Sequence, residues 1–63
     1  MKNSIVFPFE EGLQFNSVKE VQVKLLDSVG AYQLIITHDS GNVTYHFMPV
    51  NTVWYTQAPV RLI

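Results

Sequence analysis

The sequence predicts a mainly β protein: a small antiparallel sheet or partly closed barrel of four to five strands, in a single domain spanning residues 1–63. Residues 32–47 (YQLIITHDSGNVTYHF) carry the clearest signal. Two runs of alternating, β-rich residues flank the turn-forming cluster at residues 39–42, which indicates a β-hairpin. A chain of 63 residues leaves no room for a second domain.

Residues 4–9 (SIVFPF) place three apolar side chains on one face, as a strand does. Pro8 has no N–H to donate to a neighbouring strand, so we expect this segment to be an edge strand at most. Residues 10–12 (EEG) indicate a loop. Leu13 and Phe15 are expected to be isolated anchors that pack back onto the core.

Residues 17–29 fit two interpretations. As a strand, the segment alternates Val21, Val23 and Leu25 with polar residues. As a helix, it begins at Ser17 with Glu20 in a capping box, which gives an α+β alternative with a helix at 17–29. Four valines within twelve residues favour the strand, because β-branched side chains lose rotamer freedom in a helix.

The register of the hairpin is predicted by matching its apolar faces, because a slip of one residue turns every side chain to the other face. Matching sets Ile36 opposite Tyr45 and Leu34 opposite Phe47. This register assigns both aromatic rings to the core face of the hairpin.

The C-terminal part supplies the candidate contact residues. Residues 52–57 (TVWYTQ) predict a further strand in which Trp54 shares a face with threonines, and a tryptophan on such a half-polar face is typical of an interface anchor. Residues 60–63 (VRLI) are unusually apolar for a terminus. We therefore expect a partner to contact a set of four residues: Trp54, Val60, Leu62 and Ile63. The alternative is that the tail folds back over the open end of its own sheet.

No residue pattern indicates catalysis. The chain has no cysteine. Its two histidines, His38 and His46, point to opposite faces in the predicted hairpin register and lie about 13 Å apart in the alternative one, so neither register lets both hold one metal ion. No nucleophile motif or glycine-rich phosphate loop is present. We expect no enzymatic activity, no cofactor and no metal site.

Composition indicates a binding protein. The chain is 48% hydrophobic and only 14% charged, so apolar surface stays exposed unless a partner or a second copy covers it. The layout resembles small SH3-like or Sm-like barrels, without a motif of either. We predict a non-catalytic protein-binding or self-assembling module, such as a small cytoplasmic regulator or inhibitor of a larger machine, with no membrane segment. The alternative is a single-stranded nucleic-acid-binding barrel, which a net charge of −1 disfavours.

Overall fold

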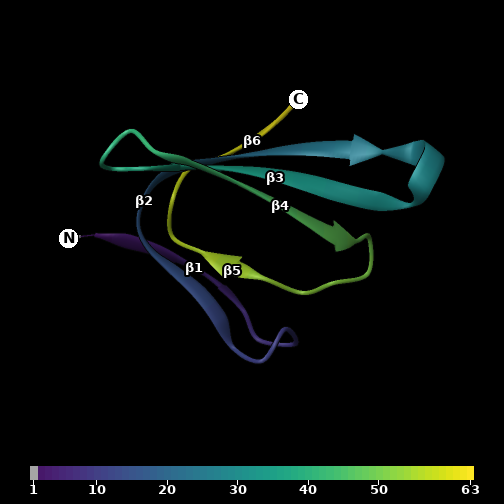
Figure 1. The fold of residues 1–63 in the computed structure, drawn as a ribbon, viewed down its shortest axis with the longest axis horizontal. Helices are drawn as coiled ribbons and strands as arrows, with labels where there is room; N and C mark the ends of the chain where they lie inside the picture. Colours follow the sequence, from purple (N-terminus) through teal and green to yellow (C-terminus); the bar gives the residue numbers. More distant parts are fainter. Residues whose placement is uncertain (1) are drawn as a thin grey trace.

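Figure 1 shows the computed structural model of the chain, which describes residues 2–63. The elements are β1 (Asn3–Phe7), β2 (Leu13–Leu26), the 3-10 turn η1 (Asp27–Val29), β3 (Ala31–His38), β4 (Val43–Pro49), β5 (Tyr55–Thr56) and β6 (Val60–Leu62). The strands form one sheet in the order β4-β3-β2-β1-β5, with β6 beside β2. The predicted antiparallel β fold is confirmed, and the sheet is not closed into a barrel.

The long strand β2 joins the two halves of the sheet. Its first part pairs with β1 and its second part with β3, and both pairings shift register close to Ser17, whose φ is +57°. Such an irregularity bends and twists a strand, and Figure 1 shows β2 turning from the lower layer into the upper one. The helix considered for residues 17–29 is wrong. Val18, Val21 and Val23 pack on the pleated strand, and within residues 17–29 helical backbone is confined to η1.

Strand β1 lies inside the sheet, between β2 and β5, so the expectation of an edge strand is wrong. The strand ends at Phe7, which leaves Pro8 in the following turn, where its missing N–H faces no neighbouring strand. Strand β5, shorter than the predicted 52–57, pairs with the centre of β1 at Ile5 and Val6. The two edges of the main sheet path are therefore β4 and β5.

The hairpin of β3 and β4 exists as predicted, but its register differs by one residue. Leu34 lies opposite His46, and Ile36 lies opposite Thr44. The loop explains the difference: Gly41 donates to the carbonyl of His38, and the His38 N–H donates to the carbonyl of Asn42. This closes a three-residue loop in which Gly41 has a φ of +93°, the usual position for glycine in such a hairpin.

The core lies between the two layers of the bent sheet. Phe15, Tyr32 and Trp54 pack against it while staying partly exposed. Its buried members come from β1, β2, β3 and β4 and from the segment after β5: Ile5, Phe7, Val18, Val21, Val23, Leu34, Ile36, Met48 and Ala58.

Candidate docking surface

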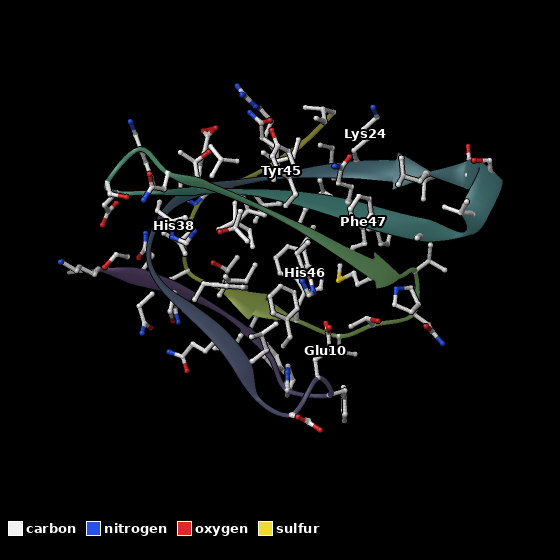
Figure 2. All side chains as sticks on the ribbon, viewed as in Figure 1. Glu10, Lys24, His38, Tyr45, His46 and Phe47 are labelled. Atoms are coloured by element: carbon white, nitrogen blue, oxygen red, sulfur yellow. The ribbon has the colours of Figure 1, made fainter. Side chains whose placement is uncertain are left out.

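Strand β4 turns its aromatic side chains away from the core. Because of the observed register, Val43, Tyr45 and Phe47 project from the outer face of the sheet, the side opposite the core. Tyr45 is 61% exposed, Phe47 60% and Val43 45%. We call these three residues the β4 strip. Figure 2 shows Tyr45 and Phe47 on the opposite side of the ribbon from His46.

The backbone of the β4 strip is also unpaired. In an antiparallel pair, residues alternate between those that exchange hydrogen bonds with the partner strand and those whose N–H and C=O point away. The hydrogen bond from the His38 N–H to the Asn42 carbonyl shows that the even-numbered residues of β4 are those that exchange hydrogen bonds with β3. Val43, Tyr45 and Phe47 therefore direct their backbone groups to the free side of β4, where the sheet order has no further strand.

The inner side of β4 is held by polar contacts. His46 Nε2 lies 3.0 Å from Glu10 Oε2, and the imidazole packs on Phe7 with ring centroids 4.3 Å apart. Nearer the turn, His38 Nε2 lies 2.7 Å from the hydroxyl of Thr44. These contacts satisfy the polar side chains that β4 turns inward, and they fix which face of the strand is exposed.

The surroundings of the β4 strip are polar but carry few charges. Lys24 and Gln33 share a cross-strand row with Phe47, and Figure 2 shows Lys24 on the same side of the ribbon as the two rings. Gln22 and Ile35 share the row of Tyr45, which continues across β2 to Arg61 on β6. Arg61 Nη2 lies 3.8 Å from Glu20 Oε1 in an exposed ion pair.

A depression of about 280 Å³ adjoins one end of the β4 strip. Phe47 belongs to both surfaces. The other residues around the depression come from the start of β3, from the turn before it and from the end of β4: Val29, Gly30, Ala31, Met48 and Pro49. The apolar surface thus continues from the free edge towards η1, and Val29 on this turn is itself 69% exposed.

The residues predicted from sequence to contact a partner lie elsewhere. Val60 and Leu62 belong to β6, which pairs in parallel with β2, and Ile63 donates its N–H to the carbonyl of Val23. The tail therefore folds back on its own sheet, although Leu62 remains 80% exposed. Trp54 is half-buried against the core, apart from β6. Contact of these four residues with a partner stays a prediction.

Matching the two apolar faces of the hairpin places Tyr45 and Phe47 in the core, and the structure shows that this prediction is wrong: both are surface residues. The signal that identifies them is the spacing of Gly41 after His38. A glycine in the third position of a three-residue loop sets the other register, and that register turns the odd-numbered residues of β4 outward.

Comparison of the chain with protein-family models, with curated proteins and with solved structures finds no match. Within residues 2–63, no group of three or more His, Asp or Glu side chains is arranged to hold a metal ion. Over the same residues, no helix is long and apolar enough to cross a membrane.

Proposed function

We propose that the protein is a non-catalytic protein-binding module that docks through β4. One observation carries the proposal: the edge strand presents exposed apolar side chains and unpaired backbone groups at the same residues, Val43, Tyr45 and Phe47. Strand addition to an open edge uses both kinds of group, since the backbone supplies affinity and the side chains supply specificity.

The absence of protective features on β4 supports this function. Exposed edges are usually shielded from other strands by lysines, by inward-pointing charges, by bulges or by short strand length. Strand β4 has seven residues, pairs with β3 without a register shift and carries no Asp, Glu, Lys or Arg. Its Pro49 stands at the end, beyond the β4 strip. An edge of this kind is suited to pairing with another chain.

Affinity capture with matched variants tests the proposal. The Y45S/F47S variant removes the two rings of the β4 strip, whereas Y55S/F9S removes two rings that are at least as exposed, on β5 and in the β1–β2 loop. We expect a protein retained from a lysate by the wild type and by Y55S/F9S to be lost with Y45S/F47S. Equal retention by all three proteins would contradict docking through β4.

A second candidate function, binding of single-stranded nucleic acid, is favoured by one observation. Tyr45 and Phe47 stand two residues apart on an open sheet face whose rows also contain Lys24 and Arg61. Exposed rings on a sheet with nearby cations can stack bases and contact phosphates. The net charge of −1 and the ion pair of Arg61 with Glu20 weigh against it.

Retention on immobilised single-stranded DNA separates the two functions. Nucleic-acid binding predicts retention that falls steeply with salt and is weakened by K24Q/R61Q. Protein binding through β4 predicts no retention at physiological salt, and K24Q/R61Q then leaves protein capture unchanged.

A further inference from the structure

We propose that the occupant of the β4 edge is a second copy of this chain, paired antiparallel through β4 about a two-fold axis at Tyr45. In this arrangement Tyr45 lies opposite Tyr45 of the second copy, and Val43 lies opposite Phe47. The two sheets join into one continuous sheet. The inference rests on the proposed function, because it names the partner of the same surface.

The unpaired backbone groups select this register. With the axis at Tyr45, all three outward residues meet outward residues of the second copy, and each pair exchanges two hydrogen bonds. Moving the axis towards the end of β4 sets Pro49, which has no N–H, opposite Val43. Moving it towards the turn sets Gly41, with its φ of +93°, opposite Phe47. Only the central register uses every free group.

The side chains and charges are compatible with pairing β4 to itself. The outer face of the junction becomes a continuous apolar band, in which Tyr45 meets its own copy and each Val43 meets a Phe47 ring. Aromatic–aromatic and aromatic–β-branched cross-strand pairs stabilise a sheet. Because β4 carries no Asp, Glu, Lys or Arg, self-pairing places no like charges opposite each other within the strand.

A second copy covers more apolar surface at this edge than a strand without apolar side chains would, because each copy brings its own two aromatic rings. Tyr45 and Phe47 are each about 60% exposed. With about 200 Å² for a whole aromatic side chain, one chain offers about 240 Å² of aromatic surface and two copies offer about 480 Å². Stable interfaces bury at least about 1,200 Å², so an edge pairing through these side chains belongs to the weak class.

Cysteine cross-linking tests the register, since the chain has no cysteine of its own. Residues in a hydrogen-bonded antiparallel pair have Cα atoms about 5.5 Å apart, which suits a disulfide. Y45C is expected to form a covalent dimer under mild oxidation at least ten times faster than Y55C, a control at an equally exposed position on β5.

Cysteines away from the axis test the register further. V43C alone is expected to cross-link slowly, because the two copies of position 43 in the dimer lie about 13 Å apart along the strand. A mixture of V43C with F47C is expected to cross-link. Equal rates for Y45C, V43C and Y55C would overturn the pairing.

Charge exchange at the axis tests the symmetry. Analytical ultracentrifugation is expected to show a dimer for the wild type at 100 μM and monomers for Y45K and for Y45E, because each variant sets like charges opposite each other. An equimolar mixture of Y45K and Y45E is expected to restore the dimer. Circular dichroism and thermal unfolding check that both variants stay folded. A wild-type monomer at 100 μM, or a Y45K protein that still dimerises, would overturn the proposal.

The same proteins distinguish failure of the dimer from failure of the proposed function. A wild-type monomer that captures a different protein through Tyr45 and Phe47 overturns the second copy as occupant while docking through β4 stands. If the wild type is a monomer and Y45S/F47S captures the same protein equally well, both the second copy as occupant and docking through β4 are overturned. Salt-dependent retention of that monomer on single-stranded DNA, lost with Y45S/F47S, also overturns both and supports nucleic-acid binding.

Discussion

His46 connects the outer strand β4 to the turn after β1. Its imidazole packs on Phe7 and bonds to the carboxylate of Glu10, so one polar side chain links segments that are 36 residues apart in sequence. A polar group turned towards a core is costly unless it finds a partner, and Glu10 supplies that partner. The pair therefore stabilises the orientation of β4 that leaves Tyr45 and Phe47 outside.

Alanine substitutions separate the two contributions of His46. We expect H46A to lower the free energy of unfolding by about 2 kcal/mol, because it removes both the packing of the ring on Phe7 and the hydrogen bond. E10A removes the hydrogen bond alone. Since the Glu10 side chain is 33% exposed, we expect a loss of about 0.5 kcal/mol. Urea denaturation monitored by Trp54 fluorescence measures both, and equal losses would show that ring packing contributes little.

At the scale of elements, the loop between β3 and β4 decides which face of β4 is exposed. Three loop residues place Leu34 opposite His46, whereas the alternative register places Leu34 opposite Phe47 and turns both rings of β4 inward. The left-handed conformation of Gly41 closes this loop, so one glycine determines whether the chain has an aromatic edge.

Substitution of Gly41 tests that role. G41A is expected to lower the free energy of unfolding by about 1 kcal/mol, because a residue with a Cβ is strained at a φ of +93°. Apart from Gly41 and its two chain neighbours, no heavy atom of the described residues lies within 4 Å of the position that the Cβ would occupy, so the loss comes from the backbone and not from a clash. S40A in the same loop is the control: it removes only an exposed hydrogen bond of 3.3 Å from the Asn42 N–H to Ser40 Oγ, so we expect a change of about 0.5 kcal/mol or less. Equal changes in the urea midpoints would contradict the assignment.

The sequence predicts the elements better than their pairing, for a physical reason. Alternation over residues 32–47 identifies two strands and a turn, and the valines between residues 18 and 29 identify another strand. However, side chains alternate with a period of two residues in either register, so alternation alone does not choose between the registers. Aligning the apolar faces assumes that both strands bury their apolar side chains. Strand β4 breaks that assumption. Trp54, which its threonine neighbours place on a half-polar face, lies half-buried against the core, and its contact with a partner stays a prediction.

At the scale of the whole molecule, the β4 strip and the C-terminal tail are two of the regions that expose apolar side chains. The β4 strip lies at one edge, whereas Leu62 on β6 and Ile63 directly after it lie across β2 and β3 from that edge. With nine charged residues in 63, the protein has few charges to separate these regions or to keep copies apart. Either region is a potential contact, and the two make different predictions.

Shortening or altering β6 distinguishes a contact through the β4 strip from a contact through the C-terminal tail. Removal of residues 60–63 deletes β6 and the hydrogen bond from Ile63 to Val23, and it uncovers one side of β2. We expect a loss of about 1–2 kcal/mol in the free energy of unfolding. L62S is the milder variant. Because Leu62 is 80% exposed, it is expected to change stability by less than about 0.5 kcal/mol.

The self-association of L62S completes the test, because this variant keeps β6 in place. If copies meet through β4, L62S retains the dissociation constant of the wild type in sedimentation equilibrium, whereas Y45K loses association. The opposite pattern, with association lost in L62S and kept in Y45K, would place the contact on the C-terminal tail, as the sequence predicts for Leu62. The separation holds because β4 and β6 do not adjoin: β3 and β2 lie between them, so a substitution on one strand leaves the backbone pairing of the other unchanged.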